Sequence, residues 1–174
     1  MKTVFFDIDT QIDFVYPAGA LYVPGAEKIL PVIAQLNRQA PTLISTMDAH
    51  SENDPEFQIY PHHCVVGTVG QQKPAATLID KRDRQIIIEK QTLDCFSNSK
   101  LLPLLTELGA DRYVVYGVVT EICVRLALFG LLNTGKRVEL VTDAVKALDE
   151  SAANKMISEF LAAGGNQIQS SNLV

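Results

Sequence analysis

Short apolar runs alternate along the chain with longer stretches in which apolar residues recur every three or four positions. The short runs are rich in β-branched and aromatic residues, which is typical of strands covered on both faces. They predict six strands, at residues 3–8, 42–46, 85–89, 113–117, 138–142 and 167–170. The longer stretches predict four helices, at residues 26–39, 100–108, 121–133 and 150–163. Glycines follow three of these helices, where a left-handed cap is expected: Gly109, Gly135 and Gly164.

The order of these elements predicts an α/β fold. Strands separated by helices imply right-handed crossovers and a mostly parallel sheet with helices on both faces. We therefore expect a three-layer α/β/α sandwich with about six strands, forming a single domain over residues 1–174. The exception to the alternation is the segment from residue 49 to about 84, which has little periodicity and contains three prolines. A loop of this length in a compact domain is usually functional.

The composition of the chain argues against some classes of binding partner and indicates a compartment. The net charge of −5 argues against a nucleic-acid or membrane partner, since both usually require a basic face. No apolar run approaches the length of a membrane span, and acidic residues by position 7 argue against a signal peptide. The three cysteines are scattered, which suits a reducing compartment. The expected location is the cytoplasm.

Reactive side chains stand at the carboxyl ends of four predicted strands. Asp9 ends the first strand and Lys90 closes the third. Asp48 and His50 follow the second strand, and Cys123 lies just beyond the fourth. Ligands of open parallel sheets bind in the crevice at this edge. The sequence therefore predicts a site that combines a carboxylate, an amine, a thiol and candidate metal ligands.

Cys123 opens an apolar helical stretch, where free amides and the helix dipole favour a thiolate and could bind an oxyanion. Taken alone, a free cysteine is more often a small buried residue, as Cys64 and Cys95 are expected to be. Lys90 could stabilise a thiolate, or could be a surface lysine with a buried stem. Asp9 could be a turn residue or, beside a thiol and an amine, a general base. The combination favours a catalytic triad for attack by the thiol.

All three histidines fall in the long irregular segment. In extended backbone, residues two apart face the same side, so Asp48 and His50 can converge on one ion. His62 and His63 are adjacent and point to opposite sides, so only one of them is expected to join that pair. Imidazole and carboxylate ligands suit zinc, manganese or iron. The residues alone leave two interpretations open, a divalent metal site and an ordinary polar loop.

Several motifs cover most of the chain, from about residue 4 to 170. They are D-T-Q-I-D-F with P-A-G-A-L-Y-V-P-G-A, D-A-H with Y-P-H-H-C-V-V-G-T, I-I-I-E-K, V-V-Y-G-V-V-T-E-I-C-V, and V-T-D-A-V. The sequence thereby resembles the isochorismatase-like cysteine hydrolase superfamily, and within it the metal-dependent nicotinamidases. The motifs are highly specific for the superfamily and less specific for the substrate.

The resemblance implies a reaction. Asp9 would take the thiol proton, Cys123 would attack a carboxamide carbon, and Lys90 would stabilise the developing charges. The amides of Val119 and Cys123, beside a cis peptide bond between Val118 and Val119, would bind the oxyanion. Ammonia would leave and water would hydrolyse the thioester, with nicotinamide to nicotinate as the expected conversion.

The resemblance also implies a divalent metal, zinc in first place and manganese or iron as alternatives, and no organic cofactor. The implied metal ligands are Asp48, His50 and His63, with Glu56 as a further candidate where relatives commonly have a histidine. The implied pocket walls are Phe14 and Tyr60, and Tyr60 stands where relatives usually have tryptophan. The expected partners are a small-molecule amide and further copies of the chain, in a dimer or tetramer that could complete the substrate cover.

Other interpretations start from the same residues. Within the superfamily, the alternative is a C–N hydrolase acting on a carbamoyl or ureido compound. F-F-D-I-D-T-Q resembles the opening of haloacid-dehalogenase-type phosphatases, with Asp7 as nucleophile, but Gln11 replaces their Thr or Val and no G-D-x-x-x-D motif follows. Residues 130–137 resemble a P-loop but lack its Ser or Thr and close a helix. A non-catalytic binding protein would have no need of a complete triad.

Overall fold

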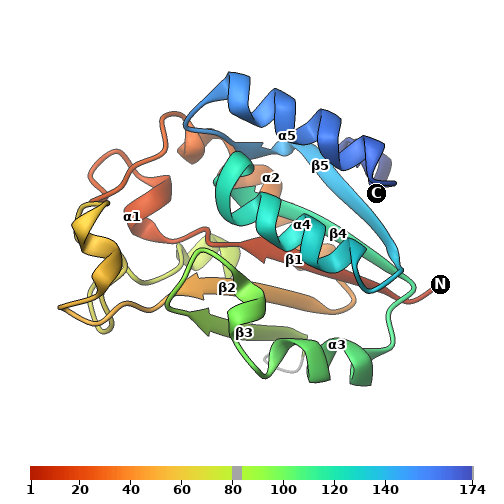
Figure 1. The fold of residues 1–174 in the computed structure, drawn as a ribbon, viewed down its shortest axis with the longest axis horizontal. Coiled ribbons are helices and arrows are strands. Elements are labelled where there is room, and N and C mark those ends of the chain that lie inside the picture. The colour runs from red at the N-terminus through yellow and green to blue at the C-terminus, as the bar shows by residue number, and fades with distance from the viewer. Residues whose placement is uncertain (80–83, 174) are drawn as a thin grey trace.

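The computed structural model describes residues 1–79 and 84–173. Within them, six strands form one parallel sheet in the order β3-β2-β1-β4-β5-β6 (Figure 1). The strands are β1 (Thr3–Ile8), β2 (Leu43–Asp48), β3 (Gln85–Lys90), β4 (Arg112–Val118), β5 (Arg137–Lys146) and β6 (Asn166–Ile168). The predicted parallel sheet of about six strands is confirmed.

Helices cover both faces of the sheet. The α-helices are α1 (Ile12–Val15), α2 (Leu30–Gln39), α3 (Leu101–Leu108), α4 (Arg125–Leu132) and α5 (Glu150–Ala162). Residues of α3, α4 and α5 pack with Phe6 and Ile8 on one face, whereas residues of α1 and α2 pack with Phe5 on the other. The alternation of neighbouring β1 residues between the two clusters follows from the pleat of a strand. The three-layer α/β/α sandwich is therefore confirmed.

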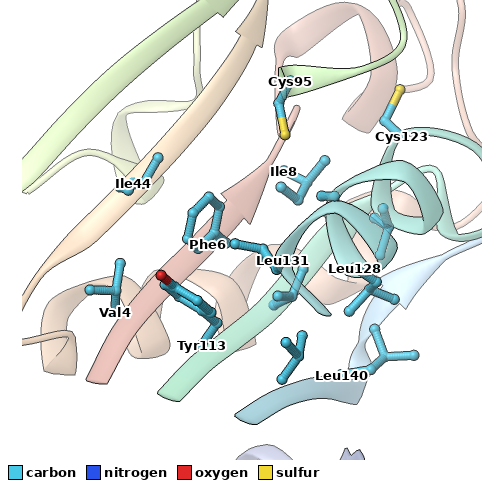
Figure 2. Close-up of a cluster of buried hydrophobic side chains, with 14 of the residues drawn as sticks. Val4, Phe6, Ile8, Ile44, Cys95, Tyr113, Cys123, Leu128, Leu131 and Leu140 are labelled. Atoms are coloured by element: carbon cyan, nitrogen blue, oxygen red, sulfur yellow. The ribbon is translucent and has the colours of Figure 1, made fainter. Parts of the chain in front are cut away.

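The cluster under α4 extends to the edge of the sheet where the strands end. Figure 2 shows Phe6 and Ile8 along β1, Leu128 and Leu131 on α4, and Cys123 at the end of the cluster. Each fully buried leucine stabilises the fold by about 1.5–3 kcal/mol. Because Cys123 belongs to this cluster, packing of the core holds its backbone in place.

Several boundaries differ from the prediction. β5 continues past residue 142, because Val145 and Lys146 pair with Gly117 and Val118 beyond a shift in register. β6 is shorter than predicted, and residues Ser170–Leu173 form a 3₁₀ turn, η6. The predicted helix 26–39 begins as a 3₁₀ segment, η1 (Ala26–Ile29), and α1 was not predicted.

The strand order places a switch point between β1 and β4. The chain moves outward from β1 through β2 to β3, then returns with β4 on the other side of β1. The carboxyl ends of β1, β2 and β3 lie at the left of Figure 1, beside α1 and the long irregular segment. Ligands bind at such switch points in open α/β sheets. Among the described residues, no helix has the length and apolar character needed to cross a membrane.

Candidate active site

Asp9, Lys90 and Cys123 meet at the carboxyl ends of β1, β3 and β4. The Lys90 Nζ atom lies 2.9 Å from Asp9 Oδ2 and 3.9 Å from Cys123 Sγ. At most 6% of each residue is exposed. Strand ends that are far apart in the sequence therefore bring together the three residues expected to form the triad.

Asp9 occupies an unusual backbone conformation at the end of β1. Its φ is +48°, in the left-handed region that non-glycine residues seldom adopt. Thr46 donates a 2.6 Å hydrogen bond to Asp9 Oδ1, whereas Oδ2 has no aligned hydrogen-bond donor among the described residues despite the nearby ammonium. Burial raises the pKa of the Asp9 carboxyl above its usual value, although Lys90 opposes the rise. A buried carboxyl with a raised pKa suits a group that accepts and returns a proton.

Lys90 is held as a buried cation. Its ammonium bonds to Asp48 and donates a 3.1 Å hydrogen bond to the Thr92 carbonyl. Burial alone would lower the pKa of Lys90, but the charges of Asp9, Cys123 and Asp48 outweigh it and hold the pKa well above its ordinary value. The site therefore keeps one positive charge beside the thiol.

Cys123 lies in a π-helical turn, η5 (Thr120–Val124), that leads into α4. Single π-turns are frequent at functional sites. Burial raises the pKa of the Cys123 thiol well above its ordinary value, although Lys90 opposes this. The helix position that favours a thiolate is thus outweighed by burial, and the resting group is a neutral thiol that needs a base.

The backbone between Gly117 and Val119, just before Cys123, packs closely against β1 and leaves one amide without an acceptor among the described residues. The peptide bond between Val118 and Val119 is cis, as the resemblance implies. In the described part of the chain, the Val119 amide has no hydrogen-bond acceptor. A Cβ on Gly117 would lie 2.1 Å from the Ile8 carbonyl oxygen, so only glycine lets β4 approach β1 here. The Val119 amide is therefore available to an oxyanion at the edge of the pocket.

Asp48, His50 and His63 form a buried cluster beside Lys90. Their candidate ligand atoms all lie within 4.8 Å of one another. Asp48 Oδ2 is 3.8 Å from His50 Nε2 and 3.9 Å from His63 Nε2, too far for hydrogen bonds. Two ligand atoms on one ion at about 2.1 Å are at most about 4.2 Å apart, and both Asp48–histidine separations fall within that limit.

Neighbouring groups orient the cluster toward a cation. His63 Nδ1 lies 2.7 Å from the Pro61 carbonyl, which places its proton there and leaves Nε2 free to ligate. His50 Nε2 has no hydrogen-bond partner among the described residues. Burial lowers the pKa of His50, but Asp48 and Asp54 outweigh burial and raise this pKa to about 9. A buried carboxylate and two imidazole nitrogens that converge, one of them without a hydrogen-bond partner among the described residues, fit a divalent metal.

Glu56 stands at the rim of this cluster. Its Oε1 atom lies 3.7 Å from His63 Nε2, and 14% of its side chain is exposed. It comes from the short 3₁₀ segment η2 (Pro55–Gln58), which Asp54 caps. Its carboxylate is within reach of an ion held by the three buried ligands.

One pocket joins the thiol to the candidate metal cluster. It encloses about 400 Å³ of empty space, including its open mouth. Its charged and polar lining comes from Asp48, Glu56, Tyr60, His63 and Cys123. Its remaining lining is apolar and consists of Phe14, Leu21, Leu93, Val118, Val119, Ile122 and Leu148. Both predicted wall residues, Phe14 and Tyr60, are present, and His63 rather than His62 faces the pocket.

The sequence alone assigned no role to some residues of the site. Thr46 donates a hydrogen bond to Asp9, and the Thr92 carbonyl accepts one from Lys90. No short motif predicts either contact. The Gln11 side chain bonds to both the amide and the carbonyl of Asp48, at 2.7 and 2.8 Å. Leu93 and Leu148 line the pocket from loops, where a lone leucine has no distinctive pattern.

The phosphatase and P-loop interpretations find no support in the geometry. Asp7 is fully buried and bonds to Thr10 and Asn37, so its carboxylate faces no pocket. Residues 130–137 run from the end of α4 into β5. A phosphate cradle needs the opposite order, from a strand through a loop into a helix.

Comparison with known proteins agrees with this geometry. The nicotinamidase of Acinetobacter baylyi is 28% identical, over 96% of this chain and 92% of its own. The pyrazinamidase of Pyrococcus horikoshii, solved in complex with zinc, has a TM-score of 0.86 and 29% identity, over 97% of this chain and 99% of that chain. PnC1 from L. infantum, solved in complex with nicotinate, has a TM-score of 0.89 and 30% identity, over 98% and 93%. The family model described as the isochorismatase domain matches residues 3–172, and the chain belongs to that family.

Proposed function

We propose that the protein is a cysteine-dependent amidohydrolase that releases ammonia from a small neutral carboxamide, with nicotinamide as the first candidate. The observation that carries the proposal is the meeting of Cys123 with Lys90 and Asp9, together with the pocket that runs from Cys123 to the candidate metal cluster. The A. baylyi nicotinamidase and the nicotinate complex of PnC1 support this choice of substrate.

The first half of the reaction makes a thioester. Asp9 accepts the thiol proton as the Cys123 sulfur attacks the carboxamide carbon, and the carbonyl electron pair moves onto oxygen. The amides of Val119 and Cys123 donate to this oxyanion, and one such donor contributes about 3 kcal/mol to lowering the barrier. Asp9 then returns the proton to nitrogen, the C–N bond breaks and ammonia leaves.

The second half restores the thiol. Asp9 accepts a proton from water as the water oxygen attacks the thioester carbon. The same amides bind the second oxyanion. The C–S bond breaks, the sulfur regains a proton through Asp9, and the carboxylic acid leaves. Lys90 remains charged throughout, because its ammonium is paired with Asp9 and Asp48.

We infer that Asp48, His50 and His63 would hold a divalent metal, zinc in first place, with manganese or iron as alternatives and Glu56 as a further candidate ligand. When bound, it would supply a Lewis acid for the ring nitrogen of a pyridine carboxamide. Phe14 packs near this end of the pocket, with its ring centroid 5.4 Å from that of His63. Phe14 and Tyr60 would cover the faces of the substrate ring.

The charge of the pocket favours a neutral substrate. Its described lining contains two carboxylates, Asp48 and Glu56, and no lysine or arginine. In the metal-free pocket, a ureido acid would bring a third negative charge into this lining, and the neighbouring Lys90 ammonium is already paired with Asp9 and Asp48. A neutral carbamoyl or ureido compound remains the alternative within the same chemistry.

Ammonia release from a panel of compounds tests the proposal. Nicotinamide and pyrazinamide should release ammonia, whereas benzamide, which lacks the ring nitrogen, should react more slowly. Neutral ureido compounds serve as the alternative substrates. Cys123→Ala should release none. The proposal is wrong if that variant keeps full activity or if no compound of the panel yields ammonia with the native protein.

A further inference from the structure

A second buried lysine–carboxylate pair lies next to the proposed base. The Lys73 Nζ atom is 3.0 Å from Asp7 Oδ2, and the two side chains are 1% and 0% exposed. Asp7 precedes Asp9 by two residues on β1, and Lys73 lies in the long segment between β2 and β3. Neither residue lines the pocket.

The contacts of Lys73 converge on the residue that follows Asp9. Its ammonium donates to the Thr10 hydroxyl at 2.5 Å and to the Thr10 carbonyl at 3.4 Å. The Thr10 hydroxyl in turn donates to Asp7 Oδ1 at 2.6 Å. The ammonium thus donates two hydrogen bonds to Thr10 and forms an ion pair with Asp7, so Thr10 is tied to both charges of the pair.

Residues 10–13 and 70–73 run side by side, and we call them the brace. The bonds that join them, besides those of Lys73, are Gln11 Nε2 to the Gln71 carbonyl, Ile12 N to the Gln72 carbonyl, and Asp13 N to the Gly70 carbonyl. The same Gln11 side chain holds the backbone of Asp48. The brace therefore connects the strand end that carries Asp9 to a candidate metal ligand.

The fold itself gives little reason for this ion pair. Replacing a buried ion pair by apolar residues is often neutral or stabilising, so stability alone is a weak explanation. Asp9, by contrast, has a φ of +48°, a conformation that persists only where the surrounding structure over-determines it. The lysine contacts to Thr10 supply such a constraint on the peptide that follows Asp9.

We propose that Lys73, paired with Asp7, is a positioning residue. It holds the backbone at Thr10 so that the carboxylate of Asp9 keeps its place against Cys123. This inference rests on the proposed role of Asp9 as the base.

Lys73→Met keeps the length of the side chain and removes its charge. We expect kcat to fall by about tenfold to a hundredfold, the loss expected for a small misplacement of a reacting group. KM and bound metal should stay close to native, because Lys73 touches neither the pocket nor the cluster. Arg112→Met is the control, because it removes a partly buried ion pair with Glu139, which keeps Arg137 as a partner, at the amino end of the same sheet. It should lower stability without changing kcat.

The double variant Asp7→Asn/Lys73→Met tests the same idea without an unpaired buried charge. It should be more stable than Lys73→Met and yet keep the low kcat, because the Thr10 carbonyl still lacks its donor. Recovery of native kcat in the double variant would overturn the inference. So would a kcat in Lys73→Met equal to that of Arg112→Met, or an effect confined to KM.

Alkylation of Cys123 separates this inference from the proposed function. If the native protein releases no ammonia from any amide, the proposed function has failed. The positioning role of Lys73 is then tested by the rate at which iodoacetamide modifies Cys123, measured by mass spectrometry. In that case Lys73→Met should slow modification by about tenfold, since a misplaced Asp9 no longer takes the thiol proton. Equal rates in the native protein and Lys73→Met would then overturn the positioning role.

Discussion

Replacing Lys90 with methionine should lower the free energy of unfolding of the metal-free protein by about 3–5 kcal/mol. The Lys90 ammonium pairs with the carboxylates of Asp9, at 2.9 Å, and Asp48, and none of the three side chains is more than 2% exposed. At an effective dielectric constant of about 20, one unit charge pair at this distance is worth about 6 kcal/mol. The desolvation of Lys90 offsets part of this attraction. Methionine fills similar space but leaves two buried carboxylates without a cation.

Thermal unfolding followed by circular dichroism in excess EDTA measures this loss. For a chain of this size, 1 kcal/mol shifts the melting temperature by about 2–4 °C, so the expected decrease is about 6–20 °C. Lys155→Met, an exposed position on α5, is the matched control and should change stability by no more than about 0.5 kcal/mol. Adding Asp48→Asn to Lys90→Met should recover part of the loss. A melting temperature for Lys90→Met within about 2 °C of native would refute the reasoning.

Four further predictions follow from the site. Cys123→Ala should abolish ammonia release while circular dichroism reports an intact fold, and full activity would remove this thiol from the mechanism. Asp9→Asn should lower kcat by about 10²–10⁴, because Lys90 stays paired with Asp48 while the base is lost; unchanged steady-state kinetics would contradict the assignment. His63→Ala should lose bound metal after dialysis, measured by plasma mass spectrometry, and a native metal content would exclude this ligand. Burial raises the pKa of Cys95 to about 12, whereas the thiol of the unfolded chain has a pKa of about 8.5. The stability that the protonated thiol contributes is therefore fully present below about pH 8.5 and is lost as the pH rises toward 12. The stability difference between native protein and Cys95→Ala in urea should therefore shrink from pH 8 to pH 10, and a constant difference would contradict this.

Strand ends made much of the site predictable. Parallel strands share one carboxyl edge, so Asp9, Lys90 and Cys123 could be expected to meet once each was assigned to the end or exit of its strand. The pairing of Asp48 with His50 followed from the two-residue period of extended backbone. The motifs then distinguished His63 from its neighbour, which local pattern alone left open.

The contacts that hold the site together were beyond sequence patterns. Lys73 and Asp7 lie 66 positions apart, and neither is part of a periodic pattern. Gln11 looks like one polar residue of a motif until the structure shows its bonds to Asp48. No local pattern marks the π-turn at Thr120–Val124, and β5 continues where its later residues pair with β4 beyond a shift in register.

The switch point between β1 and β4 divides the site along the chain. The proposed base Asp9, the candidate metal cluster and Lys90 all come before β4 in the chain. The Cys123 thiol and the Val119 amide follow β4. A break at the exposed turn after α3, near Gly109, would therefore yield two fragments that each lack half of the reactive groups. For the two fragments to rebuild the site, β1 must pair with β4 in the native register, from Thr3 with Arg112 to Ile8 with Gly117. Each fragment could be fused to one of two other proteins. Activity would then return only when those two proteins bring the fragments together, as in a split-enzyme assay.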